Sequence, residues 1–113
     1  MNKRNDFTGV NNRVNARGVA FIKSRKSIDN VKTILNDMNN MADANGITLT
    51  RAYHDPSFSL DFDRREIDVF FGMIDSECAQ VVVVRSLNEI TDNVSDLEKF
   101  ILTLAAKGVA VYC

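Results

Sequence analysis

The sequence is poor in the residue types that cross-link small proteins or build metal sites. Its 113 residues include two cysteines, one histidine, one proline and no tryptophan. Neither Cys78 nor Cys113 has a second cysteine or a histidine at ligand spacing, so we expect no disulfide, no metal and no cofactor. We expect both thiols to be reduced and buried as small hydrophobic groups. The lone His54 is expected to be a satisfied polar residue at a strand end.

Long apolar runs and an excess of one charge are also lacking. No segment has the length and apolarity of a signal peptide or a membrane anchor, so we expect a cytoplasmic protein without a membrane partner. The composition, 45% hydrophobic and 26% charged, is typical of a soluble globular protein, and the length suits one compact domain. A net charge of -1 gives no general attraction to nucleic acid, so DNA binding would need a local basic patch.

One basic patch stands in the first residues, which are rich in asparagine and poor in apolar side chains. We interpret residues 1–16 as a flexible basic leader and residues 17–113 as the folded domain. If the chain binds DNA, we expect weak, salt-dependent contacts from the cations of this patch, which are Lys3, Arg4, Arg13 and Arg17.

Apolar segments predict four strands, at residues 18–23, 47–54, 80–84 and 109–112. Helices are predicted between them, each with a cap or stop signal: Ser27 and Gly46 for the first, the pair Asp63 and Glu66 for the second, and the pair Ser95 and Glu98, with Gly108, for the third. The inward faces are expected to be Ile28, Val31, Ile34, Leu35, Met38, Met41 and Ala42; then Ile67, Phe70, Phe71 and Ile74; then Leu97, Phe100, Ile101, Leu104 and Ala105.

This alternation predicts a three-layer α/β fold with a mainly parallel sheet of four or five strands and helices on both faces. Ligands of such sheets bind beyond the carboxyl ends of the strands, which selects residues 23–26, 55–61 and 85–92. Residues 23–27 read Lys-Ser-Arg-Lys-Ser where a glycine-rich phosphate loop would stand, which disfavours a dinucleotide-binding fold.

The order of these motifs resembles the N-terminal catalytic domain of the serine recombinases, the resolvases and invertases, over residues 18–112. The first strand is similar to the family's opening strand, which ends in the nucleophilic serine. Ser27-Ile28-Asp29 resembles the start of the family's first helix, AYHD (residues 52–55) its second strand, and Asp63-Arg64 the step that opens its next helix. VVVVRSLNEITD (residues 81–92) is similar to a strand followed by the family signature Leu-Asp-Arg-x-x-Arg, and KGVAVY (residues 107–112) to its last parallel strand.

The resemblance implies a chemistry that several residues here contradict. The family's serine attacks a DNA phosphodiester while arginines stabilise the charge that develops on the phosphorus centre. Its first-strand arginine falls on Phe21 or Ile22, its nucleophile on Lys23 or Ser24, and its signature Asp and two arginines on Asn88, Glu89 and Asp92. Arg64 is the arginine that matches, and Asp55 and Asp63 are further matches. We interpret the pocket as degenerate.

Three functions follow as hypotheses. The first is a resolvase-like domain related to DNA recombination that is catalytically inactive and acts as a protein-binding or regulatory module, with DNA, a related recombinase or another protein as partner. The second is active DNA cleavage and strand exchange by Ser24 with Arg64, in which Lys23, Arg25, Lys26 or Arg85 rebuild the cation cluster. The third is a receiver-like regulator with Asp55 as phosphoryl acceptor.

The resemblance also implies a long dimerisation helix and a DNA-binding helix-turn-helix after the last strand, whereas the sequence ends at Cys113. We therefore expect a monomer or a weak homo-oligomer. Phe58, Leu60 and Phe62 alternate in a polar loop, where they are expected either to tuck against the core or to form a docking surface.

Overall fold

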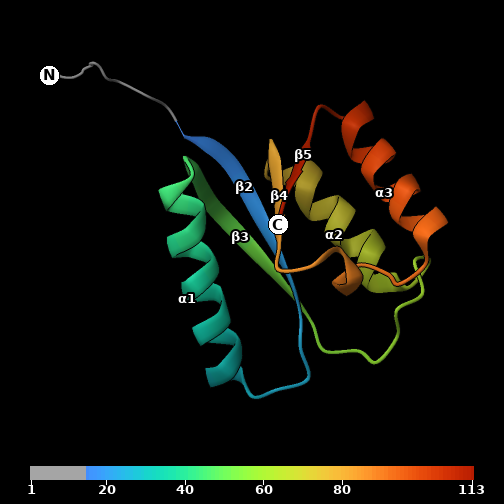
Figure 1. The fold of residues 1–113 in the computed structure, drawn as a ribbon, viewed down its shortest axis with the longest axis horizontal. Helices are drawn as coiled ribbons and strands as arrows, with labels where there is room; N and C mark the ends of the chain where they lie inside the picture. The colour runs from blue at the N-terminus through green and yellow to red at the C-terminus, as the bar shows by residue number, and fades with distance from the viewer. Residues whose placement is uncertain (1–14) are drawn as a thin grey trace, which may run out of the picture.

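Four parallel strands form the centre of the fold, with helices on both sides (Figure 1). The computed structural model describes residues 15–113. No helix in that range has both the length and the apolar character needed to cross a membrane. The elements in chain order are β2 (Ala16–Lys23), α1 (Ile28–Ala44), β3 (Ile47–Asp55), α2 (Arg65–Ser76), β4 (Val81–Val84), the short 3₁₀ helix η1 (Leu87–Glu89), α3 (Val94–Ala106) and β5 (Ala110–Tyr112).

The strand order is β3-β2-β4-β5, and every neighbouring pair is parallel. Lys23 lies beside Asp55 at the end of β3, and Phe21 lies beside Val84 at the end of β4. The carboxyl ends of these three strands therefore meet at one edge of the sheet. The three-layer, mainly parallel α/β fold expected from the sequence is confirmed.

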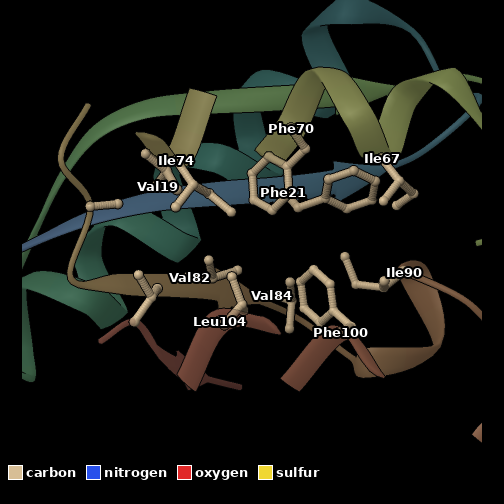
Figure 2. Close-up of a cluster of buried hydrophobic side chains, with 12 residues drawn as sticks. Val19, Phe21, Ile67, Phe70, Ile74, Val82, Val84, Ile90, Phe100 and Leu104 are labelled. Atoms are coloured by element: carbon tan, nitrogen blue, oxygen red, sulfur yellow. The ribbon is translucent and has the colours of Figure 1, made fainter. Parts of the chain in front are cut away.

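Side chains of the central strands alternate between two apolar layers. Val19 and Phe21 pack with α2 and α3, whereas Ala20 and Ile22 pack with α1. Figure 2 shows the first of these layers, in which the Phe21 ring meets Phe70 edge-on at 5.0 Å between centroids. Both faces of β2 and β4 are covered, which explains why their sequences are apolar without alternation.

Of the three predicted helix starts, one is correct and two are wrong. The Ser27 side chain accepts a hydrogen bond from the Asn30 backbone N–H at 3.3 Å, as expected of an N-cap. Asp63 does not cap α2, because the last extended residue is Arg64, whose side chain turns inward and makes no cap bond. Ser95 lies inside α3, which starts earlier because the Asn93 side chain accepts from the Asp96 N–H at 3.0 Å.

Several residues expected to be buried are exposed. Ile28 is 61% exposed because it is the first residue of α1. Ile101 (41%) and Ala105 are exposed because each follows a buried residue, Phe100 or Leu104, and so points about 100° away from it around α3. Both cysteines are free and exposed, so their expected burial is wrong. Cys78 occupies a left-handed turn after α2 (φ 52°), and Cys113 follows the last residue of the edge strand β5.

The expected leader lies almost entirely outside the described residues, and so do Lys3, Arg4 and Arg13. The sheet begins at Ala16, one residue before the expected domain boundary. Arg17 is an exposed residue of β2, and its Nε donates to the Glu77 carbonyl at 3.1 Å.

Candidate functional site

The carboxyl edge of the sheet brings charged side chains from four segments into contact. Lys23 ends β2 and Asp55 ends β3, while Arg64 precedes α2 and Glu89 ends η1. Arg85, the first residue after β4, joins them through Glu89. These residues form one network of ion pairs and hydrogen bonds, which we call the edge network.

Arg64 occupies the centre of the edge network and is almost fully buried, with its side chain 5% exposed. Its Nε donates to Asp55 Oδ2 at 3.0 Å. Its Nη1 donates to the Asp61 and Ile90 carbonyls at 3.0 and 2.6 Å, and its Nη2 donates to the Glu89 carbonyl at 3.1 Å. Because a guanidinium has five N–H groups, four of those of Arg64 are already committed.

Asp55 is fully buried and accepts bonds on both carboxylate oxygens. Oδ1 accepts from the Ser57 backbone N–H at 2.9 Å, and Oδ2 accepts from Arg64 and, at 3.4 Å, from Lys23 Nζ. Burial by itself raises the pKa of Asp55, but the hydrogen bonds from Ser57 and the nearby charges of Lys23 and Arg64 outweigh it. The net pKa lies below its ordinary value, so Asp55 is a carboxylate at neutral pH.

Lys23 is held by the loop that follows β3. Besides its contact with Asp55, its Nζ donates to the Ser57 carbonyl at 2.6 Å and to Ser57 Oγ at 3.2 Å. Sequence reasoning included Ser57 in the 55–61 segment but gave it no role, although it bonds to both Asp55 and Lys23. The available signal was the Asp-Pro step after β3, because an aspartate side chain in a turn often accepts from the backbone N–H two residues on.

Glu89 points into the edge network rather than to solvent. One carboxylate oxygen accepts from the Lys23 backbone N–H at 2.7 Å, and the other accepts from Arg85 Nε at 2.8 Å. Arg85 also donates from Nη2 to the Lys23 carbonyl at 3.1 Å. Glu89 and Arg85 thus close off the end of β2, and the Glu89 carboxylate stands at the position where the resemblance implies an arginine.

The other predicted positions of the 85–92 segment lie apart from this network. Asn88 is exposed, and its backbone N–H donates to Ser86 Oγ at 3.2 Å. Asp92 and Asp63 line a separate groove of about 420 Å³ at the start of α3. We call this the acidic groove, because its carboxylates are Asp61, Asp63, Asp92 and Asp96.

Ser24 takes part in local turn structure. Its backbone N–H donates to the Asp55 carbonyl at 3.1 Å, and its Oγ accepts from the Lys26 backbone N–H at 3.1 Å. His54 Nε2 lies 2.8 Å from the Ser24 carbonyl, so the histidine is a satisfied polar residue as expected. Within residues 15–113, no side-chain cation lies within hydrogen-bonding distance of Ser24 Oγ.

The two residues of β2 on which the resemblance places an arginine, Phe21 and Ile22, face opposite sides of the sheet. Phe21 faces the α2 and α3 layer, and the Arg64 guanidinium carbon lies 5.8 Å from the centre of its ring. Ile22 faces α1. The neighbouring Tyr53 stacks on Phe21 at 5.9 Å, and burial, followed by the carboxylates of Glu66 and Asp55, raises its pKa above the ordinary value. The base of the site beneath Arg64 is therefore aromatic.

Comparisons with known proteins identify the fold. No protein-family model matches the chain, and neither does any curated protein sequence. Among solved structures, the C-terminal catalytic domain of ISC1926 TnpA, an IS607-like serine recombinase, superposes with a TM-score of 0.71 and 18% identity over 85% of this chain and 68% of that one. The N-terminal catalytic domain of TP901-1 integrase superposes with a TM-score of 0.67 and 18% identity over 84% and 74%. The fold is that of serine recombinase catalytic domains.

Proposed function

We propose that this domain is related to DNA recombination, does not cleave DNA, and acts as a protein-binding or regulatory module. The observation that carries the proposal is the inward carboxylate of Glu89, bonded to the Lys23 N–H and to Arg85. A serine-dependent strand cleavage needs cations around the phosphate, and here the partly buried Glu89 neutralises the nearby Arg85.

The size of this effect is large for catalysis. A unit charge about 4 Å from a phosphate is worth roughly 1 kcal/mol in water and about 4 kcal/mol at an effective dielectric constant of about 20. Replacing attraction by repulsion doubles the difference, and about 1.4 kcal/mol already changes a rate tenfold. Because Glu89 is paired with Arg85, the pair offers a phosphate little net charge, and loss of the attraction of one cation at this position would by itself cost about tenfold or more in rate.

Arg64 does not compensate for Glu89. Four of its N–H groups bond to Asp55 and to three backbone carbonyls; the bonds to Asp55 and Ile90 are buried, and those to Asp61 and Glu89 are partly buried. Turning the guanidinium toward a phosphate would leave the Asp55 carboxylate with Lys23 as its remaining cationic partner in the described chain. This cost disfavours the alternative of active cleavage by Ser24 with Arg64.

The receiver-like alternative is disfavoured by the position of Asp55. A phosphoryl acceptor must be reached by its donor, and Asp55 has no exposed surface. Both of its oxygens already accept hydrogen bonds from Ser57, Lys23 and Arg64. Its geometry is that of a structural carboxylate.

A role in protein binding is supported by the outer face of α3. Val94 is 75%, Leu102 68% and Ile101 41% exposed, although all three are large apolar residues. Exposed apolar side chains gathered on one helix commonly mark a contact surface for another protein. We place the protein in the cytoplasm, since free and exposed thiols persist in a reducing compartment.

The test is incubation of the full chain with supercoiled DNA, followed by a denaturing gel, with an active serine recombinase as positive control. We expect no nicking and no covalent protein–DNA adduct. A shifted phosphoserine adduct that disappears in Ser24→Ala would overturn the proposal. Light scattering over a concentration series tests the accompanying expectation of a monomer or weak homo-oligomer.

A further inference from the structure

An arginine and a phenylalanine form an exposed stack beside the edge network. The Arg25 guanidinium carbon lies 3.2 Å above the centre of the Phe58 ring, and Arg25 Nη1 donates to the Pro56 carbonyl at 3.2 Å. Phe58 is nevertheless 79% exposed, and Arg25 is exposed as well. The loops after β2 and β3 thus hold an aromatic ring and a cation together at the surface, where neither contributes to the core.

The charges of this edge are divided unevenly. Lys23, Arg64 and Arg85 are paired with Asp55 or Glu89. The exposed Arg25 and Lys26 form no ion pair with any carboxylate of residues 15–113. The half of the edge beyond β2 and β3 is therefore basic, and we call Arg25, Lys26 and Phe58 the basic-aromatic patch.

The other half of the same edge is acidic. Four carboxylates line the acidic groove at the start of α3, and Lys99 is the cation that lines it with them. Its ion pair with Asp96, at 3.8 Å, offsets one of these charges. A polyanion that covered the whole edge would be attracted at one end and repelled at the other.

We propose that the basic-aromatic patch binds a single strand of nucleic acid, with a base stacked on the exposed Arg25–Phe58 pair and a phosphate beside Lys26. Unpaired bases stack on aromatic rings and on guanidinium planes, and lysines contribute by neutralising the backbone. A single strand is narrow enough to follow the basic half. A duplex keeps its base faces stacked inside itself, and its second row of phosphates would approach the acidic groove.

This inference goes beyond the proposed function and involves no covalent step. It requires neither a free Arg64 nor a nucleophilic Ser24, because the residues of the patch lie outside the edge network. Oligonucleotide binding and DNA cleavage are measured in separate assays, so a negative result for this inference does not contradict the proposed function, and the reverse also holds.

The experiment is fluorescence anisotropy of a labelled short oligothymidylate, an oligouridylate of equal length, and the corresponding thymidine–adenosine duplex, each titrated with the full chain. We expect a single strand to bind at least about tenfold more tightly than the duplex. Tighter binding of the oligothymidylate would identify DNA as the ligand of the patch, and tighter binding of the oligouridylate would identify RNA. Phe58→Ala and Arg25→Ala should each weaken binding of that strand by about fivefold or more.

Two matched controls separate the patch from general effects. Val69→Ala removes an exposed apolar side chain of α2, and Lys99→Ala removes a cation from the acidic half; neither should change the affinity by more than about twofold. Lys26→Ala should lower the slope of log affinity against log salt by about 0.7. Residues 1–14 are the same in all variants, so their contribution cancels.

Phe58→Leu tests whether stacking, rather than apolar contact, is responsible. We expect it to lose most of the affinity that Phe58→Ala loses, because a leucine offers no aromatic face. Equal binding of wild type and Phe58→Ala would overturn the proposal. So would duplex binding as tight as that of the single strands, or full competition by polyglutamate, which would show that the patch recognises charge alone.

Discussion

Arg64 is a charged residue that the fold uses as an internal cross-link. It joins the end of β3 to the segments before α2 and after η1 through one carboxylate and three carbonyls. The resemblance made Arg64 a candidate catalytic arginine, but nothing in the sequence indicated that its N–H groups bond to structural acceptors. The same side chain would serve catalysis only if these acceptors were satisfied in another way.

Arg64→Ala should lower the free energy of unfolding by about 3 kcal/mol, because it leaves a buried carboxylate short of a partner and the Glu89 and Ile90 carbonyls without their donor. Lys23 remains beside Asp55, which keeps the loss at the lower end of the range for broken buried pairs. The neighbouring exposed Arg65 is the matched control, and Arg65→Ala should change stability by less than about 0.5 kcal/mol. Urea unfolding measures both; equal effects would contradict the assignment.

Asp55 should make stability depend on pH at the acid end. Its folded-state pKa lies below its ordinary value of 3.8, so the folded state binds fewer protons than the unfolded state in that range. The stabilisation is fully present above about pH 5, where the unfolded-state carboxyl is ionised as well, and is lost as the pH falls through the folded pKa. The difference in unfolding free energy between wild type and Asp55→Asn should therefore shrink from about pH 5 to about pH 2. A difference that stayed constant would show that Asp55 has no lowered pKa.

At the scale of elements, β2 depends on a close approach at its beginning. A Cβ on Gly18 would lie 2.6 Å from Ile47 Cγ2 and 3.2 Å from Leu49 Cδ2, both on the neighbouring strand β3. The strand register also shifts between Gly18 and Val19. This glycine is required for the space it leaves, which allows β2 and β3 to pair tightly.

Gly18→Ala should destabilise the protein by about 1–3 kcal/mol, because the added methyl overlaps side chains of β3. Gly72→Ala should instead stabilise it by about 0.5–1 kcal/mol, since Gly72 lies in α2 and its Cβ would have nothing within 4 Å. Thermal unfolding of the two variants gives shifts of opposite sign if this is correct. A stabilised Gly18→Ala would mean that β3 moves aside without cost.

The helix starts show how accurately local capping patterns predict the first residue of a helix. Ser27 was identified correctly because nothing competes with its cap bond to Asn30. Ser95 and Asp63 have the right spacing to their glutamates, but the chain enters α3 already at Asn93, and before α2 the inward Arg64 determines where the extended backbone ends. Capping patterns predict that a helix begins nearby, whereas tertiary contacts select the residue.

For the whole molecule, the central strand β4 decides whether the chain folds. Val83 has no exposed surface and packs in the α1 layer, so Val83→Asp would bury a charge without a partner. The cost of several kcal/mol is a large part of the roughly 5–15 kcal/mol that stabilise a typical domain. We expect the variant to lose its cooperative unfolding transition in circular dichroism.

Val94→Asp is the control for this change. Val94 is 75% exposed at the start of α3, where a negative charge is favourable to the helix dipole. We expect this variant to fold like the wild type. A folded Val83→Asp protein, or an unfolded Val94→Asp protein, would contradict the assignment of core and surface.

The sequence by itself determined the order of strands and helices and the parallel three-layer arrangement, because apolar periodicity is local and each apolar face needs a covering layer. It also determined that acids stand where the resemblance implies arginines. Tertiary structure alone decided that Glu89 turns inward to the Lys23 N–H, 66 residues away in the sequence, while Asp92 lines a separate groove. The exposure of Ile28, Cys78 and Phe58 was also decided by the tertiary structure, because burial depends on which elements pack over a residue. Side-chain direction at a sheet edge is set by partners distant in sequence, and no local pattern encodes them.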